Sequence, residues 1–121
     1  CGAHLSGQPL NPQLTSRGAR RVSATVTAPV YRLYALADGK RPGLMQAGPG
    51  EAGAAIEVEG WELPAREFGS FVAGIPAPLG IGRTRLADGS EVCGFICEPA
   101  GLQGATDITA YGGWRAWKAA G

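Results

Sequence analysis

The sequence lacks several features that would place it in a specialised class of protein. Its 121 residues contain no apolar run near the roughly 20 residues that a membrane span needs. No basic segment followed by an apolar stretch marks a signal peptide. Lysine and arginine total 11, aspartate and glutamate total 10, and the two signs are mixed, so no basic stripe suits nucleic acid. We therefore expect neither a membrane nor a nucleic acid as partner.

Cysteine and histidine are scarce as well. The three cysteines, Cys1, Cys93 and Cys97, are an odd number, which argues against a closed disulfide framework. Cys93 and Cys97 stand four residues apart in a strand-like run, so they share a face about 13 Å apart and cannot be bridged. We predict buried free thiols and, from them, a reducing cytoplasmic compartment. With one histidine and no paired ligand spacing, the sequence predicts no metal and no cofactor.

Glycine and proline are abundant, with 20 and 9 residues, and 45% of the chain is hydrophobic. This composition predicts a packed core with many turns and short elements. The length fits one domain over residues 1–121. We expect an α+β fold in which a small mixed sheet curls toward a β-barrel with short helices at its rim. Because the chain starts at Cys1 without methionine, we expect a piece of a longer polypeptide.

The first half of the chain has patterns of one helix and two strands. Asn11-Pro12 is typical of a helix start, and that helix would have an apolar face made of Leu14, Ala19, Val22 and Val26. Branched and aromatic residues predict a strand over Val30–Leu36, and an irregular loop follows over 40–53. Alternation over Ala54–Leu63 predicts a half-buried strand with a bulge at Gly60. Its inward residues are Ile56 and Val58, and its outward residues are Glu57 and Glu59.

The second half is predicted from turns and prolines. Pro64 opens a short helix that ends near Ala73. Asp88-Gly89 between two strand-like runs predicts a hairpin of Ile81–Ala87 and Ser90–Cys97. A last short helix after Gly112-Gly113 would bring two tryptophans onto the core.

The candidate for chemistry is His4, in the loop Gly2-Ala3-His4-Leu5-Ser6-Gly7. Successive backbone N–H groups in such a turn can converge on an anion. An imidazole in the same loop can donate a hydrogen bond or a proton near neutral pH. The alternative is a histidine that faces solvent or caps the turn. Ser6 is a poor nucleophile, because only the fold could bring an acid such as Asp107 to orient His4.

Other polar groups are explained by structure unless the fold brings them to the loop. Glu57, Glu59 and Glu62 surround one strand, where outward carboxylates are usually solvated, although one of them could face a shallow pocket under the His4 loop. Asp107, Tyr111 and Tyr34 stand in apolar contexts, and a buried tyrosine hydroxyl usually finds a partner.

Five blocks of the sequence together resemble the C-terminal domain of allophanate hydrolase. They cover nearly the whole chain in order: GAHLSGQPLN (2–11), YRLYAL (31–36), AAIEVEGWELP (54–64), FGSFVAGIPAPLGIG (68–82) and ATDITAYGGWRAW (105–117). The resemblance implies a γ-glutamylcyclotransferase-like fold, a small mixed β-barrel with peripheral helices. His4 then takes the place of the serine or threonine of the cyclotransferase loop. The region that matches the cyclotransferase glutamate, Phe68–Phe71, has no acid, and Glu67 only adjoins it.

The resemblance also implies an activity in urea and allophanate degradation. A separate amidase domain, in the same or another polypeptide, releases ammonia from allophanate and leaves N-carboxycarbamate. The C-terminal domain then promotes decarboxylation of this small anion, with His4 as general acid or orienting donor. The residues that we assign to substrate binding are Gly2, Ala3, Leu5, Ser6, Gly7, Asn11, Tyr34, Glu57 and Tyr111. Two alternatives remain open: a non-catalytic domain that stabilises or assembles the amidase, and a γ-glutamylcyclotransferase-like enzyme. A homo-oligomer is possible in each case.

Overall fold

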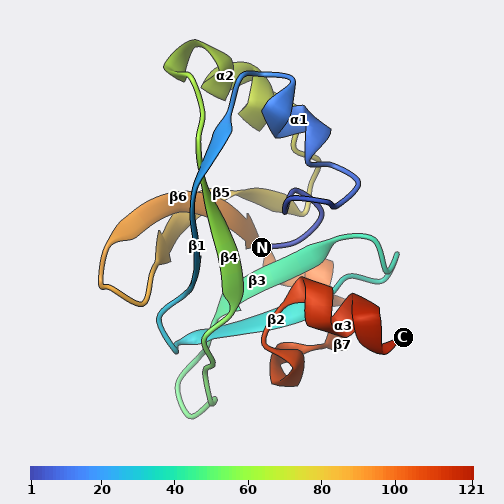
Figure 1. Ribbon diagram of the computed structural model, residues 1–121. Coiled ribbons are helices and arrows are strands. Elements are labelled where there is room, and N and C mark those ends of the chain that lie inside the picture. Colours follow the sequence, from blue (N-terminus) through green and yellow to red (C-terminus); the bar gives the residue numbers. More distant parts are fainter.

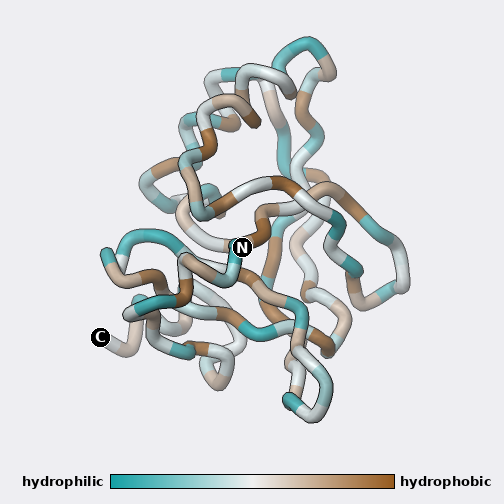
Figure 2. Tube along the Cα trace, turned by 180° about the vertical axis from the view of Figure 1, so that it is seen from behind, coloured by the Kyte–Doolittle hydropathy of each residue, from teal (hydrophilic) through white to brown (hydrophobic).

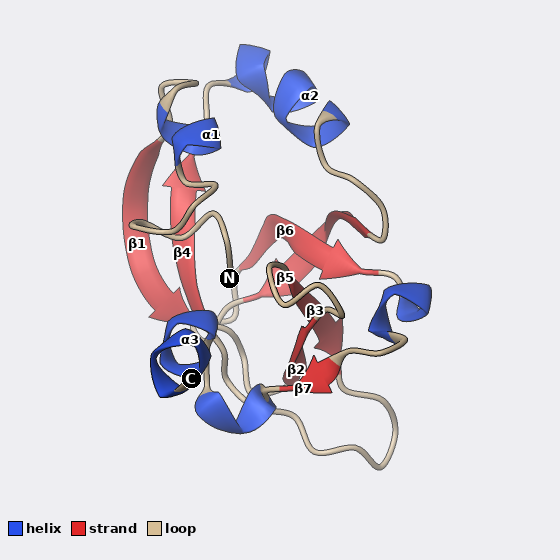
Figure 3. Cartoon of the chain, turned by 90° about the vertical axis from the view of Figure 1, so that its right-hand side faces the viewer, coloured by secondary structure: helices blue, strands red, loops and turns tan.

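The computed structural model describes residues 1–121. Seven strands form three small antiparallel sheets, and short helices surround them (Figures 1 and 3). The strands are β1 (Arg20–Val26), β2 (Tyr31–Ala35), β3 (Pro42–Gln46), β4 (Glu57–Glu62), β5 (Leu79–Arg85), β6 (Glu91–Cys97) and β7 (Thr106–Asp107). The helices are α1 (Pro12–Thr15), α2 (Ala65–Ala73), α3 (Trp114–Ala120) and the 3₁₀-helices η1 (Pro99–Leu102) and η2 (Thr109–Tyr111).

The first sheet pairs β1 with β4, and β1 corrects the prediction of a long helix after Asn11. The helix α1 ends at Thr15, and the chain is extended from Arg20 onward. Gly18 has a φ of +80°, which interrupts a right-handed helix and which glycine adopts at little steric cost. The valines and threonine that follow suit a strand, and β1 gains a ladder of hydrogen bonds with β4. Tertiary pairing therefore overrides the apolar spacing that suggested a helix.

The strand predicted over Ala54–Leu63 is confirmed as β4, which covers Glu57–Glu62. Ile56 and Val58 are 0% and 8% exposed, as their inward assignment requires. The predicted bulge lies on the other strand: the register shifts between Arg21 and Ser23 of β1, opposite Gly60. The outward assignment of the glutamates is wrong for one of them, because the Glu59 side chain is only 2% exposed.

The second sheet has the order β3-β2-β7. The strand predicted over Val30–Leu36 is confirmed as β2. The segment 40–53 is not wholly irregular, because it contains β3, which pairs with β2 from Ala35–Pro42 to Tyr31–Gln46. Pro42 is the first residue of this strand, where the missing N–H of proline is tolerated. The glycines and prolines around β3 predicted a loop, and the short strand there is defined by its pairing with β2.

The third sheet is the hairpin of β5 and β6, and it confirms the turn signal. Asp88-Gly89 forms its tip, where Gly89 has a φ of +89° and the backbone N–H of Ser90 donates to Asp88 Oδ1. The helix predicted after Pro64 is confirmed as α2, and the last one as α3. Both helices begin where the sequence placed them, directly after Pro64 and after Gly113.

The cysteines of β6 are free, but only one is buried. Cys97 is 5% exposed and packs near Gly43 and Gly101, whereas Cys93 is exposed. The prediction of two buried thiols is therefore wrong for Cys93. The two residues do share a strand face by spacing, but neighbouring elements cover that face only at the end that carries Cys97.

The core joins the second sheet to the N-terminal loop and to α3. Its most buried large side chains are Leu5, Leu33, Ile56, Ile108 and Trp114, each at most 1% exposed. The loop between β3 and β4, at the bottom of Figure 2, has a hydrophilic tip. No helix has both the length and the apolar character to cross a membrane. The core thus fixes the loop that carries His4, because Leu5 is one of its members.

The α+β class is confirmed, but the three sheets do not close into a barrel. Two isolated bridges join neighbouring sheets, Thr27 with Leu86 and Tyr31 with Ala54. The β1–β4 and β5–β6 pairs stand apart, with α2 at one end of the space between them (Figure 3). Residues of these four strands and of α2 line a cleft there. Closure fails because each sheet has only two or three short strands, too few to share a continuous ladder.

Candidate functional site

The N-terminal loop is anchored by close packing and by three hydrogen bonds. A Cβ atom on Gly2 would overlap the ring of Pro42, so only glycine permits this approach of the loop to β3. The backbone N–H groups of Leu5 and Leu10 donate to the carbonyls of Gly2 and Ala3, at 2.9 and 2.8 Å. Asn11 Nδ2 donates to the carbonyl of His4 at 3.0 Å. The loop therefore presents His4 from a fixed backbone.

The His4 ring lies between two phenylalanines rather than in open solvent. It stacks on Phe95 of β6, with ring centroids 4.8 Å apart and planes 16° apart. Phe71 of α2 meets its edge at 5.4 Å. Its Nε2 lies 2.7 Å from Oε1 of Gln13, so Nε2 carries hydrogen and Nδ1 is the nitrogen free to exchange a proton. The alternative of a histidine that faces solvent does not describe this ring.

Burial lowers the pKa of His4 below its ordinary value of 6.5, and the hydrogen bond with Gln13 only partly opposes this. The ring is therefore mostly neutral at pH 7 in the free domain. A bound anion beside it would favour the charged form and raise this pKa again.

Four N–H groups of the loop Gly2–Gly7 have no partner within the chain, and two of them, on Ala3 and His4, are adjacent at the histidine. The backbone nitrogens of Ala3 and His4 donate to no backbone or side-chain acceptor. Buried or half-buried N–H groups are nearly always paired, so a free pair at a histidine is informative. Such neighbouring donors suit a carboxylate oxygen. Leu5 and Ser6 do not contribute to this set, because their N–H groups are used by Gly2 and Glu59.

Glu59 is the carboxylate that reaches the loop. Its oxygens accept hydrogen bonds from the backbone N–H of Ser6 at 2.7 Å, from Ser6 Oγ at 2.7 Å and from Trp61 Nε1 at 3.1 Å. Arg115 and Arg21 add guanidinium donors at 2.9 and 3.4 Å. Burial alone would raise the pKa of Glu59, but these donors lower it to about 2. The carboxylate is therefore charged at every pH at which the domain is expected to work.

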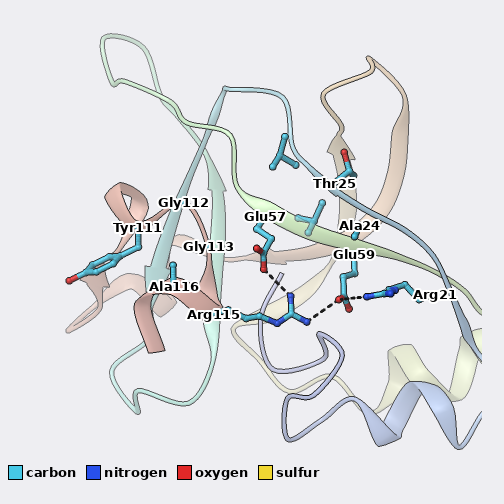
Figure 4. Close-up of a pocket in the computed structure, with 12 residues that line it drawn as sticks. Arg21, Ala24, Thr25, Glu57, Glu59, Tyr111, Gly112, Gly113, Arg115 and Ala116 are labelled. Carbon is cyan, nitrogen blue, oxygen red and sulfur yellow. Dashed lines mark hydrogen bonds and ion pairs between the residues drawn. The ribbon is translucent and has the colours of Figure 1, made fainter. Parts of the chain in front are cut away.

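Arg115 of α3 connects this carboxylate to its neighbours. It lies between Glu57 and Glu59, and Arg21 approaches Glu59 from the other side (Figure 4). Nη1 of Arg115 donates to Glu57 at 2.9 Å, and Nη2 donates to the Ser6 carbonyl at 2.7 Å. The charges of the two arginines and two glutamates balance.

Two hollows lie on either side of this network. An apolar cleft of about 290 Å³ contains His4, and Glu59 is the one acidic side chain that lines it. A wider and more open hollow of about 770 Å³ lies outside β1 and β4, toward α3, and Glu59 borders it as well (Figure 4). The cleft is lined in part by His4, Leu5, Val22, Glu59, Trp61, Phe68, Phe71, Thr84, Val92, Cys93 and Phe95.

The structure brings together only some of the residues that we assigned to substrate binding. His4 and Leu5 line the cleft, while Gly2 and Ala3 are buried and do not line it, and Gly7 is exposed. Ser6 turns toward Glu59, and Asn11 braces the loop backbone. The remaining three lie away from the cleft: Tyr34 on β2, and Glu57 and Tyr111 at the outer hollow.

Sequence reasoning overlooked four members of the site: Gln13, Phe71, Phe95 and Arg115. It also left open which carboxylate faces the loop, and the structure places Glu59 there rather than Glu57. Little in the sequence indicated that Glu59 belongs to the site, because the alternating pattern of β4 placed its side chain on the outward face. That face is covered by the loop and by α3, which no local pattern reveals.

The fold and the site define a small α+β domain with a single histidine held by a braced loop at an aromatic cleft. The chain belongs to the allophanate hydrolase C-terminal domain family, whose model matches residues 1–119. The resemblance of the five sequence blocks is thereby confirmed.

Similar proteins are mostly much longer than this chain. Urea amidolyase of Saccharomyces cerevisiae is 40% identical over 121 residues, which covers 96% of this chain but only 6% of the yeast protein. Allophanate hydrolase of Kluyveromyces lactis superposes with a TM-score of 0.91 at 41% identity, covering 98% of this chain and 20% of that one. The Escherichia coli protein c4763 superposes with a TM-score of 0.89 at 36% identity, covering 98% and 91%. The c4763 chain is therefore about as long as this one and has the same fold.

Proposed function

We propose that this domain promotes the decarboxylation of N-carboxycarbamate, the dianion left when an amidase domain releases ammonia from allophanate. The observation that carries the proposal is the loop itself, where His4 lines a cleft and the backbone N–H groups of Ala3 and His4 have no partner within the chain. The amidase would belong to the same or a separate polypeptide, in keeping with the names and greater lengths of the relatives.

The N–H groups of Ala3 and His4 would bind one carboxylate of the substrate. They are free to do so without breaking a bond within the chain. The charge of Glu59 does not oppose binding strongly, because Arg115 and Arg21 pair with it. Local donors thus supply the anion affinity that a net charge of +1 cannot supply.

The chemistry needs one proton at the substrate nitrogen. The bond between nitrogen and one carboxylate carbon breaks, its electron pair stays on nitrogen, and the carbon leaves as CO₂. Nδ1 of the protonated His4 gives its proton to that nitrogen, so the other product is carbamate. Bound dianion raises the pKa of the ring and so favours the protonated form that this step requires. Positioned general acids contribute typically about 10²–10⁴-fold.

The two phenylalanines beside His4 would favour the loss of CO₂ as well. A carboxylate is costly to place against apolar groups, whereas CO₂ is neutral and apolar. Phe95 and Phe71 lie directly beside the His4 ring, so the departing carboxylate would face them. Charge is dispersed as CO₂ forms, and an apolar wall therefore stabilises the transition state relative to the bound dianion.

Phe95→Asn is expected to lower kcat about tenfold, equivalent to about 1.4 kcal/mol of transition-state stabilisation. The affinity for malonate, a stable dicarboxylate with CH₂ in place of NH, should stay the same or rise, because the amide solvates a carboxylate. Ile96→Asn is the matched control, because Ile96 is exposed on the same strand and does not line the cleft. Unchanged kcat in Phe95→Asn would count against a role for the apolar wall. Calorimetry with malonate supplies the affinity.

The direct test of the proposal generates the substrate in place. An amidase that lacks this domain converts allophanate, and CO₂ release is followed by stopped flow with a pH indicator, with and without the isolated domain. We expect the burst of CO₂ to become faster in proportion to the domain concentration. An unchanged rate at saturating domain would rule out decarboxylation as its activity.

A γ-glutamylcyclotransferase reaction is less well supported. It needs a carboxylate that accepts a proton within reach of the loop, and Glu59 does reach Ser6. Its pKa of about 2 makes it a very weak base, and its oxygens are already occupied by donors from four residues. We infer an open variant of the cyclotransferase-like fold, in which two isolated bridges stand where a barrel would have continuous ladders.

A non-catalytic assembly role is supported by fewer observations. Val22, Phe68 and Val92 are exposed hydrophobic residues, which a docking surface would offer. All three line the cleft that holds His4, so a ligand of that cleft explains them equally well.

A further inference from the structure

We propose that Arg115 is a positioning residue that holds the His4 loop in its working conformation from the C-terminal helix α3. The inference deepens the proposed function and rests on it for its kinetic consequence. The structural consequence, the orientation of the His4 ring, does not depend on which reaction the site performs. Arg115 lies 109 positions from Ser6 in the sequence, and the loop and α3 meet only in the fold.

The guanidinium of Arg115 makes four polar contacts with three residues. Nη2 donates to the Ser6 carbonyl at 2.7 Å, to Ser6 Oγ at 3.0 Å and to Glu59 at 2.9 Å, while Nη1 donates to Glu57 at 2.9 Å. A planar, forked group can bridge carboxylates and a carbonyl in this way, whereas a lysine ammonium is a compact point charge. The side chain is 35% exposed, so part of its charge remains hydrated.

The contact with Ser6 bears directly on His4. The Ser6 carbonyl accepts no hydrogen bond from any backbone N–H, so Arg115 is its donor within the chain. Leu10 and Asn11 hold the loop at Ala3 and His4. Arg115 and Glu59 hold it two residues beyond, at Ser6. Removing Arg115 therefore loosens the loop on the side that follows His4, because the Ser6 carbonyl loses its donor and only the contacts of Ser6 with Glu59 and Arg21 remain there.

A looser attachment of the loop at Ser6 would affect the His4 ring in two ways. The stacking of His4 on Phe95 depends on the placement of the loop backbone, because the ring has no other aromatic neighbour on that face. A shift of about 1 Å in a catalytic group can cost about 10²-fold in rate. A looser ring is also better hydrated, which would weaken the burial that depresses its pKa.

The test compares Arg115→Met and Arg115→Lys with Arg20→Met in the isolated domain. Arg20 forms an ion pair with Glu62 on the same β1–β4 ladder, but both side chains are well exposed, so Arg20→Met controls for the loss of a surface arginine. Three quantities are measured: the His4 pKa by NMR titration, malonate affinity by calorimetry, and kcat for CO₂ release. Each variant is first checked by its thermal melting and NMR spectrum.

In Arg115→Met we expect kcat to fall about 10–100-fold, the His4 pKa to rise toward 6.5 and malonate affinity to change less than kcat. Arg115→Lys should recover only part of kcat, and it serves as the milder variant if Arg115→Met does not fold. Arg20→Met should match the wild type. A folded Arg115→Met variant with unchanged His4 pKa and kcat would overturn the positioning role. If the wild type itself fails to accelerate CO₂ release, the proposed function fails, while the His4 titration still tests the positioning.

Discussion

His4→Ala is expected to lower the domain's acceleration of CO₂ release by about 10²–10⁴-fold, the range that a positioned general acid contributes. The ring is the only imidazole in the chain, and the unpaired N–H groups of Ala3 and His4 adjoin it in the sequence. Alanine keeps those donors, so malonate should still bind, with an affinity reduced far less than kcat. Stopped-flow CO₂ release and calorimetry with malonate measure the two effects separately.

Gln8→Ala is the control for this experiment, because Gln8 belongs to the same loop and its side chain makes no hydrogen bond. It should leave the rate unchanged. A folded His4→Ala variant that retains the full wild-type rate would show that the imidazole takes no part in the reaction. The domain would then act through its main-chain donors alone.

The pH dependence of the wild type follows from the lowered pKa of His4. The general acid must be protonated, so kcat/KM should rise as the pH falls and level off below a pKa under 6.5. Bound dianion raises the pKa of the ring, so kcat should show its inflection at a higher pH than kcat/KM. A rate that rises with pH through this range would instead assign His4 the role of a base.

Glu59→Gln is expected to lower the free energy of unfolding by about 3 kcal/mol near pH 6, and to have almost no effect near pH 2. The pKa of Glu59 is lowered from 4.5 to about 2 in the folded domain, so its stabilising contribution is complete above about pH 4.5. It is lost as the pH falls through the folded-state pKa. The side chain is 2% exposed, so solvent screens these contacts little.

Urea denaturation at a series of pH values measures this dependence in both variants. Glu62→Gln is the matched control, because Glu62 lies on the same strand with a 63% exposed side chain and pairs only with Arg20. Exposed pairs contribute about 0–1 kcal/mol, so this variant should follow the wild type. A Glu59→Gln curve parallel to the wild type between pH 2 and 6 would contradict a charged, hydrogen-bonded Glu59 at the loop.

The sequence predicted the elements whose signals are local. Asp88-Gly89 between two branched runs indicated the hairpin, and Pro64 indicated the start of α2. It failed where a short element depends on a distant partner. β3 is defined by its register with β2, although its glycines and prolines predicted a loop. β1 is defined by its register with β4, although its apolar spacing predicted a helix.

The sequence by itself determined the family and identified His4 and its glycine-bounded loop as the candidate site, because each of these depends on short runs of contiguous residues. Only the tertiary structure decided that Glu59 is buried beneath Ser6, 53 positions away, and that Arg115 reaches the same serine from 109 positions away. It also decided that Phe71 and Phe95 enclose the ring of His4. Periodicity and turn signals report the conformation of neighbouring residues, whereas burial and ion pairing depend on which distant elements pack together.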